Sequence, residues 1–396
     1  MPPPKAIKFI PTTSTTIVGT ELANIQDVLT TNNLSGKGKY TKLCESWLQN
    51  SMKTGRPFLV SSCTSALEIA AILANIQPGD EIILPSYTYV STANAFVVRG
   101  AVPVFVDLDD RTMNIDANLI EAAITPKTKV IVPMHYGGIA CDMDAIMSIA
   151  QKHNLLVVED AAQACTSTYK GRALGTIGHM GCISFQEKKN LTAGGQGGAL
   201  LVNDATLLPR AEIIYEHGTS RAQFARGEVE RYQWLDLGTN ATLCEVQAAF
   251  LYAQLLASES ITGRRLEIWE RYYEGLAPLA GKGVVKIPRV PDGGMHNANI
   301  FYVRLEDPGR REAFQTYMAE GNIGIQAQFV PLHSSVFGKE VGRFVGQDRV
   351  TTLASLQIVL LPVHLGVSDD EAEVVVRRVL SFWEEEEEGE EGVTVV

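Results

Sequence analysis

The sequence predicts an α/β protein with a mainly parallel sheet in a large domain, followed by a smaller α+β domain. Short apolar runs rich in β-branched residues recur from residue 57 onward. These runs are continuous rather than alternating, as expected for strands that are buried on both faces. Helical stretches separate most of them, and this order is typical of a parallel sheet covered by helices on both sides.

The predicted elements follow one another regularly. The strands are FLVSS (58–62), DEIILPS (80–86), VPVFVDL (102–108), KVIVPMHY (129–136), LLVVEDA (155–161), CISF (182–185) and GALLVND (198–204). The helices between them are SALEIAAILANI (65–76), STANAFVVRG (91–100), DANLIEAAI (116–124) and DMDAIMSIAQKH (142–153). Residues 243–270 have the pattern of a long amphipathic helix that can break within its length.

A proline-rich stretch, KIPRVPDGG (286–294), marks the end of the regular alternation of strands and helices. After it, IFYVRLE predicts a strand, RREAFQTYMAEG a helix, and SDDEAEVVVRRVLSFW a closing helix with Ser368 as its N-cap. The expected organisation is an N-terminal arm (1–24), a large domain (25–270), a small domain (271–383) and a disordered acidic tail (384–396).

Composition excludes several classes of function. The chain of 396 residues has a formal charge of −11 and no basic stripe, which argues against nucleic-acid binding. The six cysteines are scattered without a C-x-x-C pair or a neighbouring histidine cluster, so neither a disulfide framework nor a metal site is expected. With no signal-peptide core and no membrane-length apolar run, we expect a cytoplasmic enzyme.

Open α/β sheets bind ligands beyond the carboxyl ends of their strands, so the residues at those ends are the candidates for ligand contacts. VSSCTSALE (60–68) passes from strand to helix, and Thr64 or Ser65 is expected to cap that helix, with Ser65 and Glu68 at capping-box spacing. The alternative is a phosphate site built from hydroxyls and backbone N–H groups at the helix N-terminus. The stretch is not a P-loop, because it has no G-K-[ST].

Two further strand ends carry candidate side chains. Tyr87 and Tyr89 follow one strand, where an aromatic side chain either packs in the core or covers a flat heteroaromatic ring. Glu159 and Asp160 end another, and a carboxylate there must be paired or hydrogen-bonded because burying it alone is costly. Its partner is either a structural cation or a protonated ring nitrogen of a cofactor.

The stretch SFQEKKNLTAGGQGGAL (184–200) places two lysines, Lys188 and Lys189, between two predicted strands. The glycines that follow can adopt the backbone shapes of a tight return. A partly desolvated lysine in such a pocket can lose its proton and form a Schiff base. A phosphate site, a stacking aromatic, an acid for a ring nitrogen and such a lysine are together what pyridoxal phosphate requires.

The stretch EDAAQACTSTYKGRALGTIGHMGCISFQEKKNLTAGGQGGALLVND resembles the core of the DegT-type sugar-nucleotide aminotransferases, which are fold-type-I pyridoxal phosphate enzymes. The resemblance covers nearly the whole chain, including TSTTIVGTE, PGDEIILPSYTYVSTANAFVVRGAVPVFVD and QDRVTTLAS. It is strongest to the branch that makes dTDP-4-amino-4,6-dideoxygalactose.

The resemblance implies a role for each matching residue. Lys189 is the Schiff-base lysine and general base, Lys188 fills a variable position, and Asp160 keeps the pyridine nitrogen protonated. The remaining cofactor contacts implied are Gln163 and Tyr89 on the ring, and Cys63, Thr64, Ser184 and Asn240 on the phosphate. Asn240 reaches the phosphate of the partner subunit, so a homodimer with shared active sites is expected.

The chain departs from the family pattern on the substrate side. Gln328 and Phe329 stand where the related branch has His and Tyr, and His333 is the best candidate for a substrate contact. Other departures from the usual residues are Gln186, Gln196, Ala241 and Asn299. They leave the cofactor groups in place but bear on the acceptor, because a buried hydroxyl or imidazole changes discrimination strongly.

The resemblance therefore implies amino transfer, with glutamate as donor, to a nucleotide-linked keto sugar such as a dTDP-4-keto-6-deoxyhexose. A second reading is a pyridoxal phosphate enzyme that acts on a non-nucleotide ketone or catalyses another reaction of the same cofactor. A third is a non-catalytic homologue with a regulatory role. A nicotinamide dehydrogenase is disfavoured, because no G-x-G-x-x-G follows the first strand.

Overall fold

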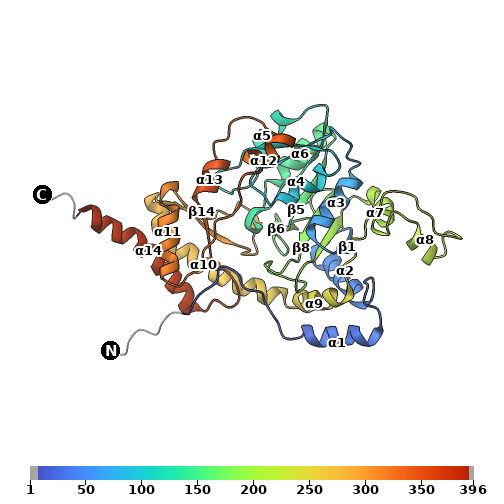
Figure 1. Ribbon diagram of the computed structural model, residues 1–396, viewed down its shortest axis with the longest axis horizontal. Coiled ribbons are helices and arrows are strands. Elements are labelled where there is room, and N and C mark those ends of the chain that lie inside the picture. The colour runs from blue at the N-terminus through green and yellow to red at the C-terminus, as the bar shows by residue number, and fades with distance from the viewer. Residues whose placement is uncertain (1–7, 392–396) are drawn as a thin grey trace.

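The computed structural model describes residues 8–391, and its centre is one eight-stranded sheet (Figure 1). The strand order is β1-β9-β8-β5-β4-β2-β3-β13. The strands are β1 (Arg56–Val60), β2 (Glu81–Pro85), β3 (Val102–Val106), β4 (Thr128–Ile131), β5 (Leu156–Asp160), β8 (Met180–Ser184), β9 (Gly198–Val202) and β13 (Arg343–Phe344). From β8 to β13 all neighbours are parallel, whereas β9 and β1 are added antiparallel. The predicted mainly parallel sheet is confirmed.

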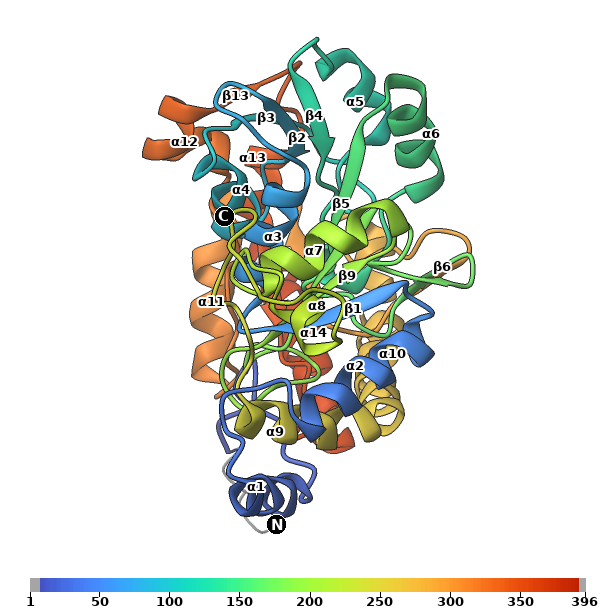
Figure 2. The same cartoon turned by 90° about the vertical axis from the view of Figure 1, so that its right-hand side faces the viewer.

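Helices cover both faces of this sheet. One face packs against α3 (Cys63–Leu73), α4 (Val90–Val97) and α7 (Leu208–Tyr215), and α3 and α7 lie in front of the central strands in Figure 2. The other face packs against α2 (Lys39–Met52), α5 (Ala117–Ala123), α6 (Met143–His153) and α9 (Glu245–Leu256). Ile83 faces one layer and its neighbours Ile82 and Leu84 face the other, which explains the continuous apolar runs.

The small domain is built on a three-stranded antiparallel sheet of order β10-β12-β14. Its elements are β10 (Val285–Lys286), β12 (Phe301–Leu305), β14 (Ile358–Leu361), α11 (Arg311–Glu320) and α14 (Asp369–Glu391). Its core contains Trp269 and Tyr272 of α10 (Ser258–Lys282), the long helix that continues α9 after a break at Ala257. Figure 1 shows α11 and α14 on the side of the molecule away from α3 and α7.

The remaining α-helices and β-strands are short or peripheral. They are α1 (Glu21–Thr31), α8 (Arg221–Ala225), α12 (Val336–Val341), α13 (Thr351–Gln357), β6 (Thr168–Tyr169), β7 (Arg172–Ala173) and β11 (Gly294–Met295). β13 pairs with β3 although its residues fall within the predicted small domain, so that segment belongs to the large sheet. In the N-terminal arm, Ile10 bridges to Ile323 and packs in the small-domain core, and α1 packs on α9.

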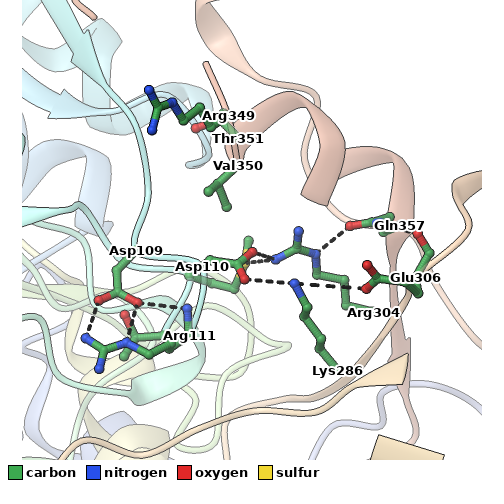
Figure 3. Close-up of polar contacts among 12 residues, drawn as sticks. Asp109, Asp110, Arg111, Lys286, Arg304, Glu306, Arg349, Val350, Thr351 and Gln357 are labelled. Atoms are coloured by element: carbon green, nitrogen blue, oxygen red, sulfur yellow. Dashed lines mark hydrogen bonds and ion pairs between the residues drawn. The ribbon is translucent and has the colours of Figure 1, made fainter. Parts of the chain in front are cut away.

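The two domains are tied by polar contacts around the end of β3 (Figure 3). Arg304 is almost fully buried and donates both to Asp110 and to Gln357, and Lys286 Nζ lies 2.8 Å from Asp110 Oδ2. The carboxylate of Asp107 accepts from the backbone N–H groups of residues 349, 350 and 351 at 2.7, 3.0 and 2.9 Å. These bonds seat the segment before α13 on the large domain.

The C-terminal helix differs from the expectation of a disordered acidic tail. Ser368 caps α14 as predicted, because Glu371 N–H donates to Ser368 Oγ and Ser368 N–H donates back to the Glu371 carboxylate. The helix then runs to Glu391, so residues 384–391 of the predicted tail are helical, and residues 392–396 lie outside the described part. Phe382 and Trp383 of α14 are buried in the small-domain core. The helical residues 384–391 follow directly after this buried part of the helix.

Candidate active site

The N-terminus of α3 lies against the end of the β8–β9 hairpin. Ser184 pairs with Gly198 across that hairpin, and a Cβ atom on Gly198 would come within 2.5 Å of Cys63 N. Only glycine therefore allows the start of α3 to approach the end of β8 this closely. The N-terminus of α3, where the first N–H groups of a helix have no partner within the helix, therefore lies beside the end of the strand that carries Ser184, an arrangement suited to an anion.

The cap of α3 differs from the prediction. Ser62 is the N-cap, with extended backbone, and its hydroxyl accepts from Ser65 N–H at 3.0 Å, so neither Thr64 nor Ser65 caps the helix. Thr64 instead donates to Ser91 Oγ, in the first turn of α4, at 2.8 Å. Because Ser62 takes the capping role, the hydroxyl of Thr64 and the N–H groups of Cys63 and Thr64 stay at the open end of the helix.

The two carboxylates at the end of β5 face opposite sides of the sheet, as neighbours in a strand must. Glu159 is fully buried and accepts from three backbone N–H groups, those of Gly175, Ile177 and Gly178, at 2.8, 2.7 and 2.6 Å. His135 Nε2 donates to the same carboxylate at 2.9 Å, while His135 Nδ1 accepts from Cys141 N–H. Glu159 is thus a structural anchor for the 175–178 turn.

Asp160 is only 4% exposed and faces the site. Thr92 Oγ1 donates to its Oδ2 at 2.6 Å, and Ala162 N–H donates to its Oδ1 at 3.1 Å. Thr88 and Thr92 share a further hydroxyl contact of 2.8 Å. Neutral donors therefore hold the Asp160 carboxyl group in place, and within residues 8–391 no ion pair to it is formed.

The two adjacent lysines differ in how far they are exposed to solvent. Lys188 is exposed, whereas Lys189 is half-buried and its ammonium interacts electrostatically with Cys63 and Asp160. Burial lowers the pKa of the Lys189 ammonium, and the two neighbours oppose that shift. Burial also raises the pKa of the Cys63 thiol, helped by Asp160 and opposed by Lys189. Lys189 thus interacts electrostatically with Asp160 at the end of β5 and with Cys63, the first residue of α3.

Gln163 closes the site on the side of the β5 loop. It is buried, and its Oε1 accepts from Gly137 N–H at 2.6 Å. That bond fixes the orientation of the amide, which leaves Nε2 as the donor available to a ligand.

The two candidate tyrosines are separated by the fold. Tyr87 is buried, donates its hydroxyl to the carbonyl of Gln328, and packs against Tyr136 and Phe329 at ring distances of 5.4 and 5.3 Å. Tyr89 precedes α4 and is 61% exposed. Tyr87 therefore packs in the core. Stacking of Tyr89 on a cofactor ring stays a prediction.

The predicted substrate-side residues lie on the segment before α12. Tyr136 donates to Gln328 Oε1 at 2.8 Å, and Phe329 adopts a positive φ of 51°. His333 has both ring nitrogens engaged, with Nδ1 2.7 Å from Ser86 Oγ and Nε2 3.2 Å from Asp348 Oδ2. Its contact with substrate stays a prediction, and that contact would require one of these bonds to open.

Asn240 is exposed and contacts His217 Nε2 through its Oδ1 at 3.2 Å. The adjoining Ala241 carbonyl accepts from Ser61 N–H at 2.6 Å, which places this segment beside the end of β1.

Sequence reasoning missed Ser91 and Thr92, which hold Thr64 and Asp160. Their place at the start of a predicted helix after a strand was the available signal. The structure also gives contacts of three residues that depart from the family pattern. Gln186 Oε1 accepts from Lys188 N–H, and the Gln196 carbonyl accepts from Gln247. Asn299 donates to Asn190.

The residues fit pyridoxal phosphate. Gly198 allows the start of α3 to approach the end of β8, neutral donors orient Asp160, and the half-buried Lys189 interacts electrostatically with that carboxyl group. Across residues 8–391, His, Cys, Asp and Glu side chains form no group of three or more suited to a metal ion. No helix in that range has both the length and the apolar character needed to cross a membrane.

Comparison with known proteins gives a consistent result. Residues 15–380 match the model of the DegT/DnrJ/EryC1/StrS aminotransferase family. The chain is 34% identical over 379 residues to the spore coat polysaccharide biosynthesis protein SpsC of Bacillus subtilis, covering 94% of this chain and 96% of that protein. It is 39% identical over 264 residues to UDP-N-acetyl-3-dehydro-alpha-D-glucosamine 3-aminotransferase of Acidithiobacillus ferrooxidans, covering 66% and 67% of the two chains.

Solved structures agree with this match. The aminotransferase TlmJ of Streptoalloteichus hindustanus superposes with a TM-score of 0.85 at 30% identity, covering 94% of this chain and 98% of that one. The PLP-form of a putative sugar aminotransferase, Spr1654 of Streptococcus pneumoniae, gives a TM-score of 0.82 at 25% identity, covering 94% and 97%. The fold is that of the fold-type-I pyridoxal phosphate enzymes.

Proposed function

Because the chain belongs to the DegT/DnrJ/EryC1/StrS aminotransferase family, we propose that it transfers an amino group from an amino acid to a nucleotide-linked keto sugar. The chain is a pyridoxal phosphate-dependent aminotransferase. When bound, the cofactor serves as the electron sink and carries the nitrogen between donor and acceptor. The acceptor, the donor and the roles of individual residues are the proposal.

The assignment of the residues is supported by the close approach of α3 to the Ser184–Gly198 pairing and by the electrostatic interaction of Lys189 with Asp160 and Cys63. In the proposed mechanism Asp160, fixed by Thr92, favours a proton on the pyridine nitrogen. Cys63 and Thr64 bind the phosphate through N–H groups at the helix N-terminus, with Ser184 beside them. Lys189 takes up and returns the proton that moves between carbon atoms, which its lowered pKa favours.

The acceptor class is supported by the relatives. One similar enzyme is named for transferring an amino group to a UDP-linked 3-dehydro sugar, and SpsC is named for polysaccharide biosynthesis. We propose glutamate as donor and a dTDP-4-keto-6-deoxyhexose as the first acceptor to test. Gln328, Phe329 and His333 are the proposed determinants of the acceptor, since they stand on one segment packed over the end of β2.

We also propose a cytoplasmic homodimer in which Asn240 completes the site of the partner subunit. The segment that leads to Asn240 exposes several large apolar side chains, and Trp234 is the most exposed at 82%. The others are Phe224, Val229, Tyr232, Leu235 and Leu237. Several exposed apolar side chains on one segment, next to an exposed polar residue, are suited to contact with a second copy of the chain.

Two measurements test the function. Borohydride reduction of the loaded protein followed by peptide mapping should place the label on residue 189, and Lys188→Ala should leave it there. Formation of 2-oxoglutarate from glutamate is then followed with dTDP-, UDP- and GDP-linked keto sugars. A label on residue 188 would overturn the site, whereas turnover with only a non-nucleotide ketone would overturn the acceptor.

A further inference from the structure

Three buried asparagines form a hydrogen-bonded group that includes the residue after Lys189. Asn190, Asn297 and Asn299 are 3%, 1% and 8% exposed. Asn299 Nδ2 donates to Asn190 Oδ1 at 2.9 Å, and Asn190 Nδ2 donates to the Asn297 carbonyl at 2.7 Å. Both ends of the Asn190 side chain are therefore fixed, and Asn190 is the residue that follows Lys189.

Asn297 extends the same connection to the other side of the site. Its Nδ2 donates to the carbonyls of Gln163 and Cys165 at 3.0 and 2.7 Å, and its Oδ1 accepts from Asn299 N–H at 3.1 Å. A Cβ atom on Gly138 would come within 2.1 Å of Asn297 Oδ1, so this approach requires glycine there. Asn297 thus links the loop of Gln163, through its side chain, to the segment that holds Lys189, through its backbone carbonyl, which accepts from Asn190.

A buried arginine of α10 holds the asparagine segment in shape. Arg265 Nε donates to the Ala298 carbonyl at 3.1 Å, and its Nη2 donates to the Asn299 carbonyl at 2.7 Å. Ala298 lies at a φ of 49°, a conformation that non-glycine residues hold only when their surroundings impose it. Burial lowers the pKa of the Arg265 guanidinium to about 9. Its desolvation is compensated by the carbonyls that it holds.

We propose that Asn297 and Asn299 are positioning residues for Lys189, and that they set the place of its amine relative to Gln163. They act through the backbone and through Asn190 rather than by touching the cofactor. Residues 297–299 lie just before β12, the central strand of the small-domain sheet. In this proposal they therefore position a lysine that belongs to the large domain. This inference rests on the proposed assignment of Lys189.

The test measures the lysine itself. In cofactor-free protein, the pH dependence of labelling by an amine-reactive reagent is followed at the peptide that contains residue 189. With Asn297→Ala or Asn299→Ala the loosened amine should gain water, so its half-labelling pH should rise by about one unit, which is about tenfold less reactive amine at fixed pH. In the loaded enzyme kcat should fall more than KM changes.

A matched control separates positioning from stability. Asn203 Nδ2 also bridges two backbone carbonyls, those of Gly175 and Gly178, both at 3.0 Å, but it follows the far end of β9 from Gly198. Asn203→Ala should lower stability without moving the titration of Lys189. The double variant Asn190→Ala/Asn299→Ala should shift that titration no further than Asn190→Ala alone, because both act on one contact.

The outcomes are distinguishable. If borohydride labels residue 189 and the titration stays within 0.2 units, about the error of such a measurement, for both variants while stability falls as in Asn203→Ala, the positioning role is overturned and the function stands. If the label falls elsewhere, the assignment of Lys189 fails first. A shift in both asparagine variants and not in the control supports the proposal.

Discussion

Thr92 Oγ1 lies 2.6 Å from Asp160 Oδ2, and this hydroxyl is the side-chain donor that orients the carboxylate in the site. Thr92→Val keeps the shape of the side chain and removes the donor. A hydrogen bond to a charged group contributes about 1.5–3 kcal/mol, so the dissociation constant for pyridoxal phosphate should rise at least about tenfold. Fluorescence titration of cofactor-free protein measures it.

The matched variant Thr92→Ser keeps the hydroxyl and should stay within about threefold of the wild type, since it loses only a methyl group. Equal weakening by Val and Ser would mean that the methyl group, rather than the hydrogen bond, supports the site.

Gly198→Ala should damage the anion site. The new Cβ atom would lie 2.5 Å from Cys63 N and from the Ser62 carbonyl carbon, both of them backbone atoms that cannot move aside cheaply. We expect a loss of about 1–3 kcal/mol in the free energy of unfolding and weaker binding of cofactor. Urea denaturation and cofactor titration give the two quantities.

The control lies in the same glycine cluster. A Cβ atom on Gly195 would come no nearer than 3.7 Å to the closest neighbouring atom, Gln247 Nε2. Gly195→Ala should therefore leave stability and cofactor binding close to those of the wild type, and equal damage from both variants would contradict the steric explanation.

Glu159→Gln tests whether Glu159 is structural while its neighbour Asp160 serves the cofactor. The new amide would turn two donor hydrogens toward a site filled by three backbone N–H groups and His135, and should cost about 2–4 kcal/mol of stability. Protein that remains folded at low temperature should still bind the cofactor. The exposed Glu187→Gln is the control and should be neutral.

Lys189 links stability to pH in cofactor-free protein. Its folded pKa is lowered, so between that value and the unfolded value of about 10.4 the unfolded chain binds more protons, and stability rises with pH. Lys189→Met removes the cost of burying the charge. Its stability advantage should be largest at neutral pH and shrink as pH approaches 10.4 or so.

Urea denaturation at fixed protein concentration, compared between wild type and variant from neutral to alkaline pH, measures this difference. Lys188→Met, at the neighbouring exposed position, is the control for loss of a lysine side chain. A constant difference for Lys189→Met would mean that its amine titrates alike in the folded and unfolded chains.

The proposed shared site predicts complementation between inactive subunits. When Asn240→Ala and Lys189→Ala proteins are mixed and allowed to exchange, each mixed dimer regains one complete site, so activity should recover to about a quarter of the wild type. Mixing Lys189→Ala with Asp160→Asn is the control, since both residues belong to one subunit's site. That mixture should stay inactive, and recovery in neither mixture would contradict a shared site.

The sequence predicted the parallel sheet because burial on both faces leaves continuous apolar runs such as that of β2. It also predicted the convergence of Asp160 and Lys189, since strand ends at one edge must meet. The strand pattern alone did not distinguish Glu159 from Asp160, because which carboxylate faces the site depends on the direction of each side chain in the strand, and the choice of Asp160 came from the family resemblance. The Asn190–Asn299 contact joins residues 109 positions apart, beyond any local pattern.

The hairpin pairing of Ser184 with Gly198 has a consequence for how this protein can diversify. The segment between Ser184 and Gly198 carries the lysine, and its two ends are paired with each other. Residues can therefore be inserted in this segment without displacing either strand. Insertions should be accepted at its exposed turn around Glu187 and Lys188. Between Lys189 and Ala193, where the chain is enclosed, even one added residue would push the reactive amine out of alignment.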